Sequence, residues 1–395
     1  MIILKETPFM KVLYYYWNEN SKDDCVDAFT RLGHEVSVWS HKFISYTRDD
    51  KFLEDIRKKI SAEGADCIFS FNYFPLLSDA AQETGIPYIS WVYDSPHYTL
   101  EAKNLSNPCN HVFIFDFALC DRYCAQGITT VDYMPLPVNI SRLDKQLADI
   151  RSTSPFPYKH DVTFLGSLYK DEYNFYEQIN YLPEQLKGFI DGIIEAQTHV
   201  YGLDFPSCLF DANKCEEIGK YVKIGLGEDY NSARDEIFRN MIRKQVTVKE
   251  RESLLRSLGD RFNLDLYSKG KPDSIKANYL GTADYVKEMP EVFATSKINI
   301  NISLRSILTG IPLRVIDILG AGGFCLTNYQ AELSEYFENG RELVWFESPE
   351  DLIEKTEYFL THDEEREQIA ANGLEAAERL FSYDVLLPKV LSQVF

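Results

Sequence analysis

The residues with the clearest chemical potential lie in one stretch, residues 298–328. It carries two arginines, a threonine, a glycine and an acid: Arg305, Thr309, Gly310, Arg314 and Asp317. All five follow an expected strand, and ligands of open α/β sheets bind at the carboxyl ends of strands. The backbone N–H groups at the start of a helix also attract anions. We therefore expect a ligand site in this stretch.

The elements that must position these residues are a strand, a loop and a helix. Apolar and polar residues alternate over residues 298–303, as in a strand with one polar face. Pro312 suits the first turn of a helix, where a backbone N–H is not needed. The apolar residues of that helix share one side: Val315, Ile316, Ile318 and Leu319. Asp317 falls opposite them, so we expect it on a charged face turned away from the core.

Bulk properties restrict the class of protein. A length of 395 residues predicts two domains, and a net charge of −20 argues against nucleic acid or an anionic membrane as partner. Apolar runs are too short for an integral membrane segment, and the N-terminus has no signal cleavage pattern. The eight cysteines show neither a disulfide framework nor metal-site spacing. These features predict a cytoplasmic protein with reduced thiols and no bound metal.

The first part of the chain alternates strands and helices, which predicts a doubly wound Rossmann-like domain over residues 1–138. Its six expected strands lie near residues 11–16, 35–39, 66–71, 87–93, 111–117 and 131–134. No Gly-x-Gly-x-x-Gly turn follows the first strand, so a dinucleotide site there is not expected. Asp94 and His97 follow the fourth strand and belong to the ligand-binding edge of this sheet.

The second part repeats the pattern after a polar stretch, residues 139–160, which we interpret as an inter-domain linker. A second Rossmann-like domain is expected over residues 161–380, with a helical insertion at about 174–258. Gly166 and Ser167 end its first strand and are expected to turn into a helix containing Tyr169 and Lys170. Residues 381–395 form an expected C-terminal helix that packs back on the first domain.

Two such domains, together with a set of motifs, resemble the GT-B glycosyltransferases, group 1, and among them the spore-maturation CgeB-like family. The motifs are DVTFLGSLY (161–169), YLG (279–281), ININI (298–302), PLRVID (312–317), GGFCLT (322–327), ELSEYFENGRE (332–342), SPEDL (348–352), DEER (363–366) and VYDSP (92–96). The resemblance covers most of the chain outside the expected insertion, and the whole set is more specific than any one motif.

This resemblance implies a transferase that uses a nucleotide-sugar, UDP-linked, as donor and needs neither a metal nor a cofactor. A helix N-terminus at Gly310 and nearby cations would stabilise the diphosphate; the candidate cations are Lys170, Arg305 and Arg314. Asp317 would bind the ribose, Gly166 and Ser167 would form the opposite lip of the pocket, and Tyr267 would flank the base. Group 1 enzymes carry a glutamate where this chain has Thr309, so its contact with the donor sugar is in question.

The acceptor side implied by the resemblance is the first domain, where Asp94 or His97 would receive the proton of an acceptor hydroxyl. Structural interpretations stand beside these roles. Asp94 would cap the turn at Ser95, His97 would be a loop histidine, and Arg314 and Asp317 would form a surface ion pair. The acceptor, a protein or a glycan, and the stereochemical outcome stay open. So do two other functions: a nucleotide-sugar epimerase, and a non-catalytic nucleotide-sugar-binding partner.

Overall fold

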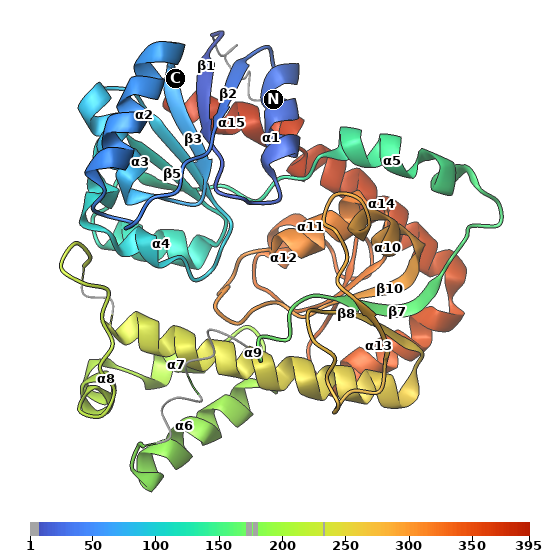
Figure 1. The fold of residues 1–395 in the computed structure, drawn as a ribbon. Helices are drawn as coiled ribbons and strands as arrows, with labels where there is room; N and C mark the ends of the chain where they lie inside the picture. Colours follow the sequence, from blue (N-terminus) through green and yellow to red (C-terminus); the bar gives the residue numbers. More distant parts are fainter. Residues whose placement is uncertain (1–7, 171–175, 177–180, 232–233) are drawn as a thin grey trace. The chain divides into compact units, whose positions relative to one another are not determined.

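The computed structural model describes residues 8–170, 176, 181–231 and 234–395 (Figure 1). The chain divides into two compact units. The first contains Met1–Asn139, Leu226–Ala233 and Arg379–Phe395, and the second contains Ile140–Gly225 and Arg234–Glu378. Among the helices in the described ranges, none combines the length and the apolar character that a membrane crossing requires.

The first unit is built on a parallel six-stranded sheet, in the order β2-β1-β3-β4-β5-β6. Its strands are β1 (Lys11–Tyr15), β2 (Glu35–Trp39), β3 (Cys67–Phe71), β4 (Tyr88–Val92), β5 (Asn110–Ile114) and β6 (Val131–Tyr133). The main helices are α1 (Lys22–Arg31), α2 (Asp50–Glu63), α3 (Pro75–Thr84), α4 (Phe117–Ala125) and α15 (Tyr383–Val394). All six strands expected here are present, which confirms the predicted Rossmann-like sheet.

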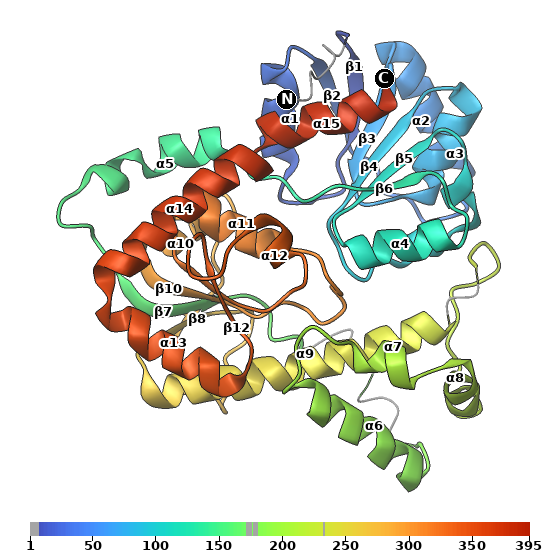
Figure 2. The ribbon, with the colours of Figure 1, turned by 180° about the vertical axis from the view of Figure 1, so that it is seen from behind.

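Successive side chains along these strands point to opposite faces of the sheet. Leu13 and Ile68 share a buried core with side chains of α2 and α3. Tyr14 points to the other face, where it stacks on Phe69 at 5.4 Å between ring centroids, beside Phe29 of α1. Helices α1 and α15 pack together on that second face (Figure 2). Because both faces are covered, β3 and β4 are buried along their whole length.

The second unit holds another parallel six-stranded sheet, in the order β12-β11-β10-β7-β8-β9. Its strands are β7 (His160–Leu165), β8 (Leu264–Tyr267), β9 (Asn278–Gly281), β10 (Ser296–Asn301), β11 (Cys325–Asn328) and β12 (Val344–Phe346). Its helices outside the segment between β7 and β8 are α5 (Ile140–Ser152), α10 (Met289–Thr295), α11 (Leu313–Gly320), α12 (Leu333–Tyr336), α13 (Pro349–Thr361) and α14 (Asp363–Phe381). These strands confirm the second Rossmann-like sheet that the sequence predicts.

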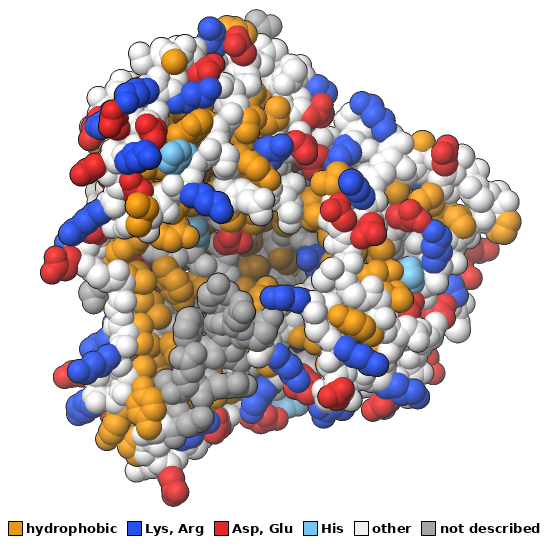
Figure 3. All heavy atoms as spheres, in the orientation of Figure 1, with side chains coloured by type: hydrophobic (Ala, Val, Ile, Leu, Met, Phe, Trp, Pro, Cys, Tyr) orange, Lys and Arg blue, Asp and Glu red, His pale blue; other side chains and the backbone are white. Residues whose placement is uncertain are grey.

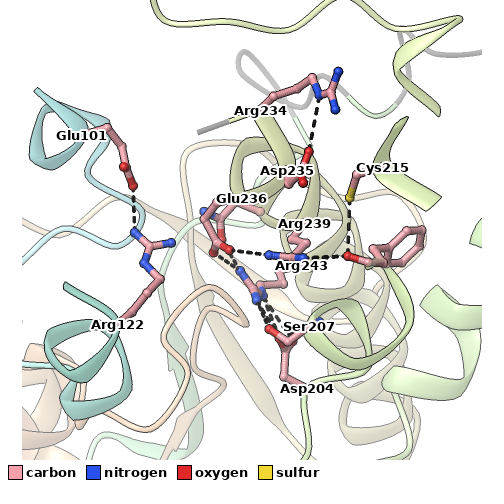
Figure 4. A network of polar contacts seen from close by, with 12 residues as sticks. Glu101, Arg122, Asp204, Ser207, Cys215, Arg234, Asp235, Glu236, Arg239 and Arg243 are labelled. Atoms are coloured by element: carbon pink, nitrogen blue, oxygen red, sulfur yellow. Dashed lines mark hydrogen bonds and ion pairs between the residues drawn. The ribbon is translucent and has the colours of Figure 1, made fainter. Parts of the chain in front are cut away.

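Between β7 and β8 the regular elements among the described residues are all helices. They are α6 (Glu184–Gln197), α7 (Phe205–Leu209), α8 (Ala212–Gly219) and α9 (Arg234–Arg261). The start of the expected insertion, near residue 174, lies outside the described residues. The helices enclose an apolar core of their own. Arg243 of α9, 1% exposed, links α9 to the start of α7 through Asp204 (2.6 Å) and pairs within α9 with Glu236 (2.5 Å) (Figure 4).

The stretch expected as a linker and the C-terminal segment each contain a helix. The stretch expected as a linker contains α5, which buries Leu143 and Leu147. Its polar residues lie on the exposed side of an amphipathic helix, which composition alone does not distinguish from a loop. At the C-terminus, α15 lies in the first unit, where Asp384 accepts a hydrogen bond from Nη2 of Arg31 at 2.9 Å.

Candidate functional site

In the second unit, the end of β7 lies against the start of α11. Gly166 directly follows β7, and its amide donates to the carbonyl oxygen of Tyr267 at 2.9 Å. A Cβ at position 166 would stand 3.0 Å from Nη1 of Arg314 and 3.2 Å from Cζ of Phe164. Glycine therefore lets the guanidinium of Arg314 lie directly against the backbone.

Arg314 itself is a partly buried cation. Its Nε is shielded from solvent and has no hydrogen-bond partner among the described residues. Burial lowers the pKa of the guanidinium, while Asp317, one turn further along α11, acts in the opposite direction. A buried donor on a charged group is costly unless something binds it. The arrangement suits an anionic ligand at the N-terminus of α11.

A second arginine, Arg251, reaches the same turn from α9. Its Nη1 donates to the carbonyl oxygen of Ser167 at 2.5 Å, and its Nε donates to that of Ile302 at 3.1 Å. The guanidinium also lies 4.9 Å from the ring centroid of Tyr169. Burial lowers the pKa of Arg251, and the positive charge of Arg314 contributes to this shift. No carboxylate in the described part of the chain forms an ion pair with either arginine.

Sequence reasoning missed Arg251. It stands within the 28-residue helix α9, whose 3.6-residue pattern predicts a helix but does not single out one arginine among several. No local motif marks it, because its partners lie at the ends of β7 and β10. Only the tertiary structure brings it to the turn after β7.

The segment after Ser167 is not the expected helix. Residues 167–170 have no regular secondary structure, and Tyr169 has a left-handed backbone with φ of 54°. Lys170 forms an ion pair with Glu252 at 2.8 Å and is about half exposed. An open pocket lies here, lined by residues 167–170 and 269–272, including Lys170, Lys269 and Lys271. Lys170 thus stays near the candidate site, at its cationic border.

Tyr267 lies at the end of β8, next to the turn at Gly166. Its ring meets the ring of His160 edge-on at 6.0 Å. Burial raises the pKa of its hydroxyl. Its backbone carbonyl orients the Gly166 amide, so Tyr267 contributes to the site at least through its main chain.

Asp317 does not lie on a charged outer face, and that expectation is wrong. Its side chain is only 8% exposed, and its Oδ1 accepts a hydrogen bond from the hydroxyl of Tyr285 at 3.1 Å. Every residue from Val315 to Gly320 is buried, because α11 packs against α10 as well as against β10 and β11. A polar residue opposite an apolar stripe is therefore still covered.

Arg305 has a different role from the one expected. Its Nε and Nη2 donate to the two carboxylate oxygens of Glu250, each at 2.8 Å, and its Nη1 donates to the carbonyl oxygen of Val200 at 3.0 Å. The side chain of Glu250 is fully buried. These bonds occupy the guanidinium and correct the expectation that it binds phosphate: Arg305 anchors the loop after β10 to α9.

Thr309 and Gly310 lie in the loop that leads into α11. Gly310 is buried. The hydroxyl of Thr309 donates to Oε1 of Glu332 at 2.8 Å, and the amide of Glu332 donates to the carbonyl oxygen of Thr309 at 3.1 Å. Glu332, which comes from the segment after β11, therefore lies beside Thr309, the position at which group 1 enzymes carry a glutamate.

The candidate acceptor residues belong to the first unit. Asp94 is exposed at the end of β4, and its Oδ2 accepts a hydrogen bond from Asn72 at 2.7 Å. His97 is engaged through Nε2 with the hydroxyl of Thr99 at 2.6 Å and with the backbone of Tyr73. Burial lowers the pKa of His97. These contacts hold the loop of His97 in place, whereas the carboxylate of Asp94 is accessible to solvent.

Charge is not concentrated on the face of the molecule drawn in Figure 3. Lysine and arginine side chains are interspersed there with aspartate and glutamate. The cations of the candidate site are thus a local feature of a strongly acidic chain.

Comparison with known proteins identifies a related family model and a related fold. Residues 244–391 match the family model described as glycosyl transferase-like. None of the curated proteins matches the chain at a significant level.

Solved structures match over almost the whole chain at low identity. A glycosyltransferase from Rickettsia africae ESF-5 is 12% identical, with 98% of each chain covered and a TM-score of 0.52. Anabaena HepE in complex with UDP-glucose is 9% identical, with 98% of this chain and 99% of that chain covered and a TM-score of 0.52. Sucrose-phosphate synthase from Thermosynechococcus elongatus is 10% identical, with 97% of each chain covered and a TM-score of 0.50. The two parallel sheets with flanking helices are those of the two-domain GT-B fold.

Proposed function

We propose that this protein is a glycosyltransferase that moves a hexosyl or N-acetylhexosaminyl group from a UDP-sugar to a hydroxyl of a protein or glycan. The observation that carries the proposal is the partly buried Arg314, whose guanidinium lies against Gly166 and whose shielded Nε has no partner among the described residues. The diphosphate of a nucleotide-sugar supplies the negative charge that this position lacks.

The chemistry follows from where charge develops. When the sugar leaves, negative charge grows on the diphosphate, and cations and backbone N–H groups already in place stabilise it. The N-terminus of α11, Arg314 and Arg251 would do so, and Lys170 would add charge at the border. We also propose that no metal is required, since these groups supply the positive charge themselves.

Asp317 and Asp94 have the other proposed roles. Asp317, held by Tyr285, would accept hydrogen bonds from the ribose hydroxyls. In the first unit, Asp94 is our candidate for the group that receives the acceptor's proton, because its carboxylate is exposed and oriented by Asn72. His97 would hold the loop that carries it.

The choice of a UDP donor is supported by the structural neighbours. HepE, at a TM-score of 0.51, was crystallised with UDP and glucose, and also with UDP-glucose. The family match over residues 244–391 supports transfer of a glycosyl group. The motifs quoted above favour the CgeB-like branch within this group.

Two measurements test the proposal. Titration calorimetry should show saturable binding of UDP in the presence of EDTA, and absence of binding by any nucleoside diphosphate would contradict it. Incubation with UDP-glucose, UDP-galactose and UDP-N-acetylglucosamine should release UDP, slowly without acceptor and faster with one. Conversion of a UDP-sugar into its epimer without an acceptor would instead identify an epimerase.

A further inference from the structure

A pocket lies at the edge of the second sheet opposite to the turn at Gly166. Its walls include residues at the amino ends of three parallel strands: Tyr158 stands before β7, Ser296 begins β10, and Phe324 stands before β11. Side chains of α5 and α14 complete the walls. The candidate donor site lies at the carboxyl ends of the same strands, so this pocket is a separate place in the second unit.

Arg366, in the first turn of α14, lines this pocket and is only 1% exposed. Its Nη1 is occupied, because it donates to the carbonyl oxygen of Phe359 at 2.7 Å and pairs with Asp363 at 2.6 Å. Its Nε and Nη2 are shielded from solvent and have no hydrogen-bond partner among the described residues. Two such donors on a charged group are costly, so the position favours a ligand that accepts hydrogen bonds from both.

These two donors are the pair with which a guanidinium binds a carboxylate side-on. Nε and Nη2 point in the same direction, so their hydrogen bonds to the two oxygens of one anion run parallel. The same chain contains this geometry elsewhere, since Nε and Nη2 of Arg305 each donate to one carboxylate oxygen of Glu250 at 2.8 Å. The corresponding edge of Arg366 has no such carboxylate in the described part of the chain.

The other walls of the pocket indicate the rest of the ligand. The apolar wall residues are Phe156, Ala294, Phe324, Ala370, Ala371 and Leu374. Two further cations of the wall already have anionic partners. Arg151 pairs with Asp144 at 2.5 Å. Lys297 pairs with Asp161 at 2.9 Å. Glu367 adds a negative charge to the wall. One unpaired guanidinium edge therefore suits a ligand with a single negative charge better than a phosphate dianion.

We propose that this pocket binds a small organic acid, with its carboxylate on Nε and Nη2 of Arg366 and its apolar body against Phe156 and Phe324. The ligand reaches the guanidinium past Tyr158, whose ring centroid lies 5.2 Å from Cζ of Arg366 and whose hydroxyl donates to Glu367 at 3.2 Å. Burial raises the pKa of the Tyr158 hydroxyl and Arg366 acts against this shift, as expected of neighbouring groups. The inference does not depend on the proposed transferase activity, because it uses no residue of the donor site.

Binding of phenylacetate to the full chain, followed by calorimetry and ligand-observed NMR, tests this inference. Phenylacetate carries one carboxylate and one apolar ring, and its binding should be saturable. Acetate lacks the apolar body and phenylacetamide lacks the charge, so each should bind at least about tenfold more weakly. Inorganic phosphate at the same concentration should not displace phenylacetate.

Variants locate the binding. Arg366→Lys keeps a positive charge but loses the side-on pair of donors, and should weaken phenylacetate binding at least about tenfold. Ala371→Phe, at an exposed position of the wall, fills the pocket while Arg366 stays in place, and should weaken it similarly. This second variant keeps the test decisive where the first does not fold. Arg341→Lys, at an exposed arginine of the same unit, is the matched control and should change nothing. UDP affinity should be the same in all three.

The contrary outcomes are distinct. Absence of saturable phenylacetate binding by the folded wild type, or equal affinity for phenylacetate and phenylacetamide, would overturn the inference. An affinity for phenylacetate unchanged in either folded pocket variant would place the ligand elsewhere and overturn it too. Displacement by inorganic phosphate would overturn the choice of a carboxylate. Absence of UDP binding by the wild type would contradict the proposed function and leave this inference standing.

Discussion

Nη1 of Arg314 lies 3.0 Å from the point where a Cβ on residue 166 would stand, so the arginine occupies space that only glycine leaves open. The two residues are 148 positions apart in the chain and meet because β7 and β10 are neighbours in the sheet. This contact sets a cation against a backbone turn at the carboxyl ends of the strands. The variants Arg314→Met and Gly166→Ala each remove this contact.

Arg314→Met should weaken UDP binding by about tenfold to a hundredfold, the loss of one or two charge-assisted hydrogen bonds. The free protein should be as stable as the wild type or more so, since removing a partly buried cation that forms no ion pair among the described residues removes a desolvation penalty. Calorimetry and thermal unfolding measure the two effects. Arg261→Met, at an exposed arginine at the end of α9, should change neither of them. A variant that unfolds early would show that Arg314 supports the fold.

Gly166→Ala should weaken UDP binding about tenfold, because the new methyl displaces the guanidinium of Arg314. The end of an arginine side chain yields more easily than backbone, so the loss of stability should be only ~1 kcal/mol. Gly188→Ala is the control: it lies in α6 with nothing within 4 Å of its Cβ. That change should raise stability by about 0.5–1 kcal/mol and leave binding unchanged.

Asp317→Asn should weaken UDP binding and reduce discrimination between UDP and 2′-deoxy-UDP. Asparagine can still accept the hydrogen bond from Tyr285, so folding should be retained. Asp317→Ala is less informative because the residue is buried, and its loss leaves the Tyr285 hydroxyl without this acceptor. Competition titrations with both nucleotides measure the effect. Discrimination equal to that of the wild type would remove Asp317 from the ribose site.

Glu250→Met should destabilise the fold by about 3–5 kcal/mol, the usual cost of removing one partner from a buried ion pair. Replacing both partners, in Glu250→Met with Arg305→Met, should cost less than the sum of the single changes, because no charge is left buried alone. Urea unfolding of the four proteins in this cycle measures the coupling. An additive result would contradict the anchoring role of Arg305.

His97→Gln should reduce the pH dependence of stability. Burial lowers the pKa of His97, so between pH 7 and 5 the unfolded chain takes up protons that the folded chain does not. Stability therefore falls as the pH falls, and the variant should lose less of it between pH 7.5 and 5.5 in urea unfolding. His34 and His111, whose pKa values are also lowered by burial, remain in the variant and keep part of the slope. Equal slopes would contradict the prediction.

Much of the architecture follows from local patterns. Short apolar strands alternating with amphipathic helices predict two parallel sheets, and both are present with six strands each. This pattern can be recognised because the apolar residues of buried parallel strands and of helix faces follow different spacings along the chain. It also predicts which turns stand at the carboxyl ends of strands, and hence that Gly166 and Arg314 lie on one edge.

The partners of the charged residues depend on tertiary structure. Arg305, Arg314 and Arg251 have the same side chain, yet the first is neutralised by Glu250, 55 positions away, while the other two converge on the turn after β7. Asp317 looks exposed from the period of its helix and is buried because α10 covers it. The same holds for Thr309, whose acid partner comes from the segment after the next strand. Sequence alone thus determined the sheets and the edge where we expect a ligand, whereas long-range packing decided which charges form ion pairs, because ion pairing depends on distance in space and not on spacing along the chain.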